Sequence, residues 1–320
     1  MLLIVVIIAT AFKGHSQNCG TATNFINTLP TYNYQAGKLY DEAPICVRVF
    51  FHIVRNTAGT TGYNQANIQG RVNYLNQVFN PHNIVIVNAG QDFIDNDIYG
   101  VEFNDGEYNA LVQINNAPNA INIYLLPINT LDYAGKASGI PGNSLVVGNQ
   151  FIETSTLSHE LGHCLNLFHT HHQLEPGGCD EAASGNTCSS CGDFVCDTPI
   201  DPTLSCGGNV DISSCNYSGG GGFTPLTNNI MSYSCRPCRT AFTGGQGLRM
   251  RISLNSDPLL SNFRTVDCIN ITGPTAVCTS GFYSINNLPA GSTVNWSLSN
   301  SNYATLAATG TSCTVTKQGN

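Results

Sequence analysis

Charged residues are scarce in this chain of 320 residues: 10% are charged, with 12 Lys and Arg against 20 Asp and Glu. A net charge of −8 and the lack of any basic run give nucleic-acid binding no electrostatic support. Long apolar runs are also missing, because the longest, Leu2–Phe12, has about eleven residues and a bilayer-spanning helix needs about 20. We therefore expect no nucleic-acid partner and no membrane span. The apolar fraction of 42% is too high for a disordered chain.

Cysteine, in contrast, is abundant. The 14 cysteines exceed what a reduced cytosolic domain of this size needs, and they favour disulfides in an oxidising compartment. The apolar N-terminal run has the length of a signal-peptide core, so we assign 1–17 to a signal peptide and 18–44 to a short N-terminal segment. A buried N-terminal strand is the alternative. Together these features predict a secreted, extracellular protein.

The first half of the chain alternates strand-like and helix-like segments. Two amphipathic stretches, Asn64–Phe79 and Thr154–Phe168, predict helices, and Gly162 is an unfavourable residue inside the second. Four apolar runs are typical of buried strands: Ile45–Val54, Ile84–Val87, Ile121–Leu126 and Leu145–Val147. This alternation predicts an α/β domain built on a sheet.

Eight of the cysteines fall between Leu174 and Arg239, a stretch with little periodicity. A loop of this length needs covalent ties, so we expect disulfides there. The pairs Cys188/Cys191 and Cys235/Cys238 could instead form a four-thiolate zinc site, but their separation is longer than such sites usually have. A closing helix is expected at Phe242–Leu254.

The C-terminal segment 271–320 is rich in Ser, Thr and Gly and has short strand-like runs at Phe282–Ile285 and Val294–Leu298. It predicts an all-β module that is about half of an immunoglobulin-like sandwich, and hence truncated. A disulfide between Cys278 and Cys313 is a natural guess within it.

Metal-binding chemistry concentrates in the second predicted helix. His159 and His163 are four residues apart, so both imidazoles leave one helix face and suit a Zn²⁺ ion, while Glu160 reaches a water at the metal rather than the metal itself. His169 is the favoured third ligand. It reaches the same metal if the helix ends and turns at Asn166 with positive φ, a conformation that Asn tolerates. His171 and His172 compete for this position and are otherwise expected at the rim of the cleft.

These residues resemble a known family. His159–His169 (HELGHCLNLFH) is similar to the long zinc motif of the metzincin endopeptidases, with Asn166 in place of the usual glycine. Three further segments follow in order and resemble the pappalysin branch, most of all its bacterial, cytophagalysin-type secreted members: GDFVCDTP at 192–199, NIMSY at 229–233 and FTGGQGLRM at 242–250. The resemblance covers about residues 45–255.

The resemblance implies an α/β (α+β) metzincin-like zinc metallopeptidase domain at 45–257, with a twisted sheet and a zinc-binding active-site helix. It implies hydrolysis of peptide bonds in polypeptide substrates, with one catalytic Zn²⁺ and Glu160 as general base. Met231 is expected in the turn beneath the metal, and Tyr233 is expected to aim its hydroxyl at the site; a core tyrosine is the alternative. A secreted adhesion protein with a structural metal site is the other reading of the whole chain, but such a site has no use for Glu160.

Three further expectations concern the surroundings of the site. Structural Ca²⁺ is one, on acidic residues of the cysteine-rich stretch: Glu175, Asp180, Asp193, Asp197 and Asp201. Solvated carboxylates are the alternative. Cys19 or Cys46 could supply a thiolate that blocks the metal in a latent form. Arg236, just after the turn, could line a specificity pocket, disfavour Lys or Arg in the substrate and accept acidic residues.

Overall fold

The structure, a computed structural model, describes residues 19–21, 43–101, 105–127, 133–182, 186–266, 270–274, 277–286, 294–298, 301 and 303–318. The expected signal peptide and most of the expected N-terminal segment lie outside these residues. Among the described residues, no helix has the length and apolar character that crossing a bilayer requires.

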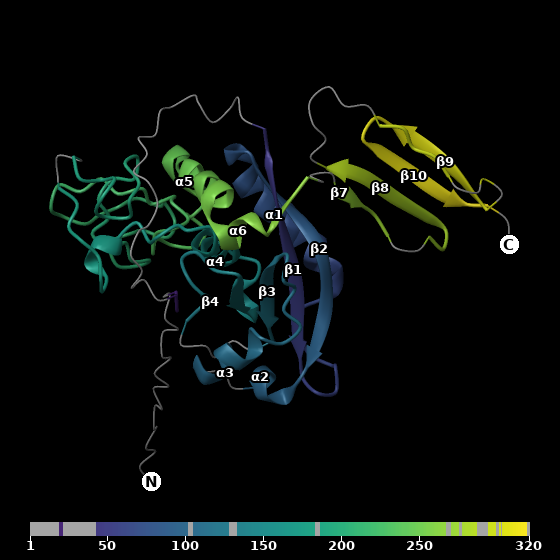
Figure 1. The fold of residues 1–320 in the computed structure, drawn as a ribbon, viewed down its shortest axis with the longest axis horizontal. Helices are drawn as coiled ribbons and strands as arrows, with labels where there is room; N and C mark the ends of the chain where they lie inside the picture. The colour runs from purple at the N-terminus through teal and green to yellow at the C-terminus, as the bar shows by residue number, and fades with distance from the viewer. Residues whose placement is uncertain are drawn as a thin grey trace, which may run out of the picture.

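A twisted six-stranded sheet forms the centre of the molecule (Figure 1). Its main strands run in the order β2-β1-β3-β5-β4, with a short β6 paired to β1. The pairs of β1 with β2 and β3, and of β3 with β5, are parallel, whereas the edge strand β4 is antiparallel to β5. The strands are β1 (Ile45–Arg55), β2 (Ile84–Asp95), β3 (Ile121–Leu126), β4 (Gly135–Ala137), β5 (Ser144–Gly148) and β6 (Arg264–Thr265). All four expected strands are therefore confirmed.

The helices pack on this sheet and close the domain. The first amphipathic stretch forms α1, whose Ile68, Val72, Leu75 and Phe79 are at most 1% exposed, as their spacing predicts. The helices are α1 (Ile68–Phe79), α2 (Asp97–Val101), α3 (Asp105–Leu111), α4 (Thr156–Cys164), α5 (Gly244–Ser256) and α6 (Pro258–Ser261), and short 3₁₀ turns occupy Gln65–Asn67, Asn80–His82, Asn149–Phe151 and His172–Leu174. The closing helix α5 begins at a capping box formed by Thr243 and Gln246.

Helix α4 is shorter than its periodicity suggests. It ends at Cys164, and Asn166 follows with a φ of +75°. Leu167 N donates to the Gly162 carbonyl and Asn166 N to the His163 carbonyl, the pair of hydrogen bonds that defines a Schellman motif. The expected turn at Asn166 is thus confirmed, and it takes Phe168 out of the expected helix.

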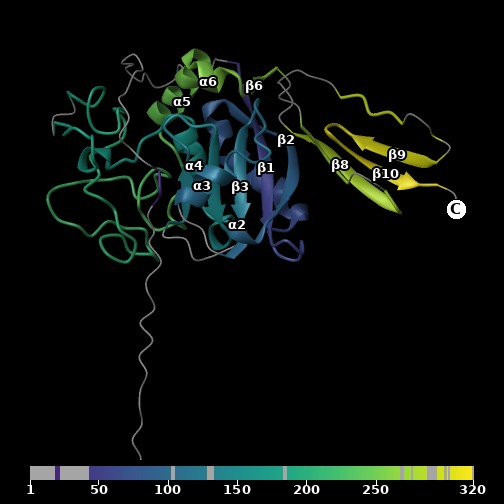
Figure 2. The same ribbon diagram turned by 60° about the horizontal axis from the view of Figure 1, so that its bottom comes forward.

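The cysteine-rich stretch has no long helix or strand in its described part, and four disulfides hold it: Cys179–Cys191, Cys188–Cys196, Cys206–Cys235 and Cys215–Cys238. The disulfide expectation is confirmed, and a four-thiolate zinc site is excluded because each of its candidate cysteines has another partner. Figures 1 and 2 show this stretch and the C-terminal sheet on opposite sides of the central sheet.

The C-terminal region forms a separate antiparallel sheet in the order β7-β8-β10-β9. Its strands are β7 (Asn270–Thr272), β8 (Ser280–Asn286), β9 (Ala304–Thr309) and β10 (Ser312–Lys317). The all-β expectation and the strand at 282–285 agree with this sheet. The strand expected at 294–298 is wrong, because those residues have no regular structure; the Trp296 indole donates a hydrogen bond to the Gly310 carbonyl.

The guessed disulfide between Cys278 and Cys313 is also wrong, since both cysteines are free. Cys313 pairs with Tyr283 across the sheet, whereas Cys278 precedes β8. The two cysteines therefore do not pair across neighbouring strands, and a disulfide needs Cα atoms within about 7 Å.

Candidate metal centre

Helix α4 and the turn after it bring three histidines together. Every residue of α4 is buried, and the helix contacts β4 and β5. The rings of His159 and His163 have centroids 4.8 Å apart, and the Asn166 turn places the His169 ring 5.1 Å and 4.5 Å from them. All three histidines are at most 2% exposed. The structure thus gathers the three histidines that the spacing selects.

The hydrogen bonds of the three rings fix which nitrogen carries the proton. Nδ1 of His159 donates to the Ile230 carbonyl at 2.7 Å, Nδ1 of His163 to the Leu167 carbonyl at 2.7 Å, and Nδ1 of His169 to Glu175 Oε1 at 2.6 Å. Burial lowers the pKa of His159 and His163 well below the ordinary value, so both are neutral. Each Nε2 of these two rings therefore offers a lone pair.

The Nε2 atoms of His159, His163 and His169 lie close together. His169 Nε2 lies 3.2 Å from His159 Nε2 and 3.0 Å from His163 Nε2. Two ligand atoms at 2.0–2.1 Å from a tetrahedral zinc lie about 3.3 Å apart. Imidazole nitrogens are preferred zinc ligands, so this donor set fits a Zn²⁺ ion, with the Nδ1 partners orienting the rings.

Glu160 lies on the same helix but uses different partners. It is 1% exposed, and burial raises its pKa to about 7. Its Oε2 accepts hydrogen bonds from Thr21 Oγ1 at 3.1 Å and Cys19 Sγ at 3.2 Å, and its Oε1 is buried without a partner. The edge strand approaches closely, because a Cβ on Gly135 would lie 2.7 Å from Glu160 Cγ.

The segment after Asn229 passes beneath the histidines, as the resemblance implies. Met231 is fully buried, and its sulfur fills the space beside Gly162. The Tyr233 ring lies 4.8 Å from the His169 ring and 4.4 Å from the His171 ring, and its hydroxyl accepts a hydrogen bond from Cys19 N at 3.2 Å. Tyr233 therefore borders the centre.

His171 and His172 do not lie at a cleft rim, contrary to expectation. They are 3% and 1% exposed and surround Glu175. The Glu175 carboxylate accepts from Nδ1 of both His169 and His172 and lies 3.6 Å from His171 Nε2. The sequence suggested Glu175 only as a calcium ligand. Its contact with His169, six residues earlier, could not be predicted, because no known motif spacing links the two residues.

Of the two candidate cysteines, Cys19 reaches the centre and Cys46 does not. The ligand atoms of Cys19 and the three histidines all lie within 4.8 Å of one another, whereas Cys46 is disulfide-bonded. Cys19 forms a parallel bridge with Gly135, Gly20 N donates to the Gly135 carbonyl, and Ala137 N donates to Thr21 Oγ1. Residues 19–21 thus lie along β4 and cover Glu160. The contact between Thr21 and Glu160 could not be predicted from any sequence motif.

The five acidic residues considered for calcium do not gather in the described part of the chain. Three of them have protein partners: the buried Asp193 accepts from Thr198 Oγ1, the buried Asp201 from Thr170 Oγ1, and the half-buried Asp197 from Thr243 Oγ1 and Gly245 N at the start of α5. Asp180 is exposed.

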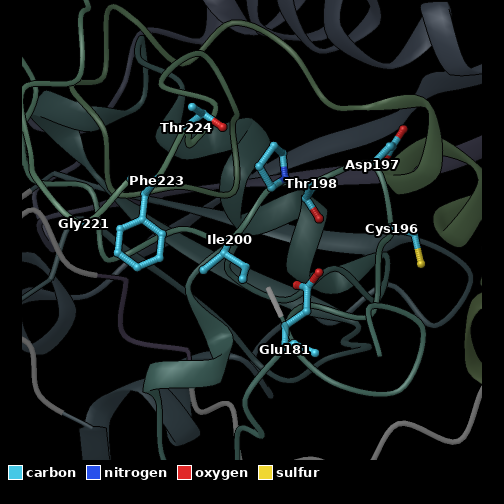
Figure 3. Close-up of a pocket in the computed structure, with 11 residues that line it drawn as sticks. Glu181, Cys196, Asp197, Thr198, Ile200, Gly221, Phe223 and Thr224 are labelled. Atoms are coloured by element: carbon cyan, nitrogen blue, oxygen red, sulfur yellow. The ribbon is translucent and has the colours of Figure 1, made fainter. Parts of the chain in front are cut away.

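A cavity of about 460 Å³ lies in the disulfide-rich stretch, with Glu181, Ile200 and Phe223 among its lining residues (Figure 3). The histidines of the metal centre are not among its lining residues. The cavity and the metal centre are thus separate features of the molecule.

Comparison with known proteins identifies the family. The family model described as Peptidase M43, pregnancy-associated plasma protein-A, matches residues 142–255. An extracellular metalloprotease of Neurospora crassa is 32% identical over 236 residues, covering 67% of this chain and 76% of that protein. One of Colletotrichum graminicola is 28% identical over 239 residues, covering 67% and 78%.

The fold is similar to that of a solved structure. A structure of mature mirolysin of Tannerella forsythia, in complex with a cleaved peptide, matches with a TM-score of 0.53 at 18% identity, covering 70% of this chain and 96% of that one. Because the matched relatives are fungal as well as bacterial, the bacterial part of the expected resemblance is not confirmed. The chain belongs to the pappalysin (M43) family of extracellular metalloendopeptidases.

Proposed function

We propose that the protein is a zinc-dependent endopeptidase that hydrolyses polypeptides, with His159, His163 and His169 as the zinc ligands. The observation that carries this proposal is the convergence of the Nε2 atoms at 3.0–3.2 Å while each Nδ1 is engaged elsewhere. Neutral imidazole is a preferred zinc ligand, and catalytic zinc sites have three protein ligands and one open position.

A bound zinc ion supplies Lewis-acid polarisation of the scissile carbonyl and of the attacking water. Glu160 accepts a proton from that water and passes it to the leaving amine. Burial with a pKa of about 7 suits this exchange, because the group can both take up and release a proton near neutrality. Tyr233, whose ring contacts His169, donates its hydroxyl hydrogen bond to the developing oxyanion.

A non-catalytic adhesion protein with a structural metal is the weaker candidate. A structural zinc site is closed by four protein ligands, whereas here Cys19 could be a fourth ligand only while residues 19–21 stay in place. It does not require a buried carboxylate such as Glu160, which has one oxygen free of partners. Calcium is not part of the proposal, because Asp193, Asp197 and Asp201 accept hydrogen bonds from protein groups and do not gather at one point.

The described form of the chain is a latent one. Cys19 and Thr21 take one oxygen of Glu160, and the Cys19 sulfur lies among the histidine nitrogens, where a thiolate would be a fourth ligand. Release of residues 19–21 would open the site. Cys19→Ser should therefore raise the rate of hydrolysis before any processing, and an unchanged rate would contradict latency through Cys19.

The proposed function also suggests limits for the domains of the chain. Residues 45–257 contain strands β1–β5 of the central sheet, the histidines and α5, and form the peptidase domain, and the short β6 at 264–265 pairs with β1 from outside these limits. Residues 271–320 belong to an immunoglobulin-like module, supported by the antiparallel sheet of β7, β8, β9 and β10. Residues 1–17 are the signal peptide.

The enzyme proposal is tested by hydrolysis of an unfolded protein by Cys19→Ser, with and without a zinc chelator, alongside Cys19→Ser/Glu160→Gln. Chelation and the second substitution should each abolish cleavage, because one removes the metal and the other the general base. Equal cleavage by Cys19→Ser and Cys19→Ser/Glu160→Gln would refute the role of Glu160.

A further inference from the structure

Two arginines lie in a loop that disulfides hold beside the metal centre. Arg236 stands between Cys235 and Cys238, and Arg239 follows directly. Cys235 is bonded to Cys206 and Cys238 to Cys215, so this short loop is tied at two points. Both arginines are therefore presented by a constrained backbone rather than by a free surface loop.

The loop contacts both sides of the metal centre. Arg236 Nε donates to Oγ1 of Thr156, the first residue of α4, at 3.2 Å, and Ser155 Oγ donates to the Arg236 carbonyl at 3.1 Å. Arg239 Nη1 donates to the Ser232 carbonyl, between Met231 and Tyr233, at 3.1 Å. One arginine is thus held at the start of the histidine helix and the other at the turn beneath it.

Three hydrogen-bond donors of this loop are buried without a partner: Arg236 Nη2, Arg239 Nε and Ser234 Oγ. Arg239 is 5% exposed, and the Arg236 guanidinium stacks on Phe151, 4.2 Å from the ring centroid. A buried donor without an acceptor costs about 1–3 kcal/mol, and more when the group is charged. Such donors indicate an acceptor from outside the loop.

The charges of the loop are only partly compensated. Among the described residues, neither Arg236 nor Arg239 forms a salt bridge, and the carboxylate whose charge acts on Arg239 is Glu160. Burial, together with the neighbouring charge of Arg236, lowers the pKa of Arg239 to about 10, so both guanidinium groups remain charged at neutral pH. Buried charges in proteins are normally paired, and here the two guanidinium groups have one carboxylate near them, Glu160, and no salt bridge to it.

We infer that Arg236, Arg239 and Ser234 bind the carboxylate of an acidic substrate residue near the scissile bond and so give the protease a preference for Glu or Asp there. A guanidinium matches a carboxylate in charge and in donor geometry. A Lys or Arg side chain at the same position would meet two like charges. The inference rests on the proposed function, because it requires that polypeptides bind at the metal centre.

Cleavage of a peptide library tests the preference. Matched peptides differ only by Glu or Gln at one position, which is moved through the four residues on each side of the cut. We expect kcat/KM to favour Glu by about tenfold or more at one position, the ratio that about 1.4 kcal/mol produces. Ratios near one at every position would overturn the inference.

Two variants locate the preference on the loop. Arg236→Gln should bring the Glu-to-Gln ratio at that position close to one. Arg264→Gln, which removes an exposed arginine on β6 and changes the net charge equally, should leave the ratio as in the wild type. An unchanged ratio in Arg236→Gln, with the far-ultraviolet spectrum of the wild type, would also overturn the inference.

A binding measurement separates this inference from the proposed function. The Cys19→Ser/Glu160→Gln double variant loosens residues 19–21 and removes the general base, so the Kd of the matched peptides is measured without turnover. Tighter binding of the Glu peptide with no cleavage by the single variant Cys19→Ser, which keeps Glu160, would refute the protease and support the anion site. Cleavage by Cys19→Ser with equal Kd values would support the protease and refute the anion site.

Discussion

Gly162 and Met231 share one space beneath the histidine cluster: a Cβ at position 162 would lie 2.6 Å from the Met231 sulfur. Met231 is fully buried, and Phe242 Cε1 lies 3.4 Å from the same point, so the sulfur has little room to move. The glycine that weakens α4 as an isolated helix is therefore required by the packing between α4 and the turn at Met231.

Gly162→Ala should destabilise the protein. Overpacking a tight core costs about 1–3 kcal/mol, which exceeds or cancels the gain of up to about 1 kcal/mol that Ala brings to a helix. Urea unfolding should show a net loss of about 1 kcal/mol.

Gly70→Ala is the matched control, because Gly70 lies on α1 and a Cβ added there would meet no neighbouring atom within 4 Å. That substitution should stabilise the protein by about 0.5–1 kcal/mol through helix propensity alone. Equal shifts in the two variants would show that the contact with Met231 has no energetic role.

Glu175 should matter for metal affinity although it is not a proposed ligand. It accepts the His169 Nδ1 proton at 2.6 Å, which orients the ring and strengthens Nε2 as a donor. Glu175→Ala should weaken zinc binding about 10–100-fold, measured by competition with a chromophoric chelator. Glu181→Ala, which removes a carboxylate at the separate cavity, is the control and should leave the affinity unchanged. Equal affinities in both variants would exclude Glu175 from support of the site.

Stability should fall in mild acid because of His82, a buried residue that contacts Gly247 of α5. Burial lowers the pKa of His82 to about 4 from its ordinary 6.5. Between these values the unfolded chain binds a proton that the folded chain does not, so stability is full above pH 6.5 and declines as the pH falls toward 4. At pH 5 the loss from His82 is about 2 kcal/mol.

Urea unfolding of the wild type and of His82→Leu at about pH 7.5 and about pH 5 measures this contribution. The variant should lose about 2 kcal/mol less than the wild type between the two pH values. The same loss in both proteins would assign the acid sensitivity to other groups.

The sequence could predict those parts of the molecule that depend on local periodicity. The α1 stripe, the β strands, the shared face of His159 and His163 and the turn at Asn166 follow from spacings of a few residues and from the backbone freedom of asparagine. The disulfide-bonded state of the cysteine-rich stretch followed from composition, but its connectivity did not.

Contacts between distant segments could not be predicted in this way. Thr21 contacts Glu160, which is 139 residues away in the sequence. A side chain at Gly135 would collide with the same Glu160 side chain. The Val294–Leu298 run has the composition of a strand. However, β8 and β10 pair with each other, and residues 294–298 have no regular structure. Strand formation and close packing depend on tertiary partners that no short window of sequence contains.

The metal content of the purified chain tests the central claim most directly. Mass spectrometry of the native protein should find one zinc ion per chain in the wild type and in Glu160→Gln, and none in His169→Ala, because Glu160 is not a ligand and His169 is. Zinc retained by His169→Ala, or lost from Glu160→Gln, would contradict the assignment of the three histidines as ligands and of Glu160 as the general base.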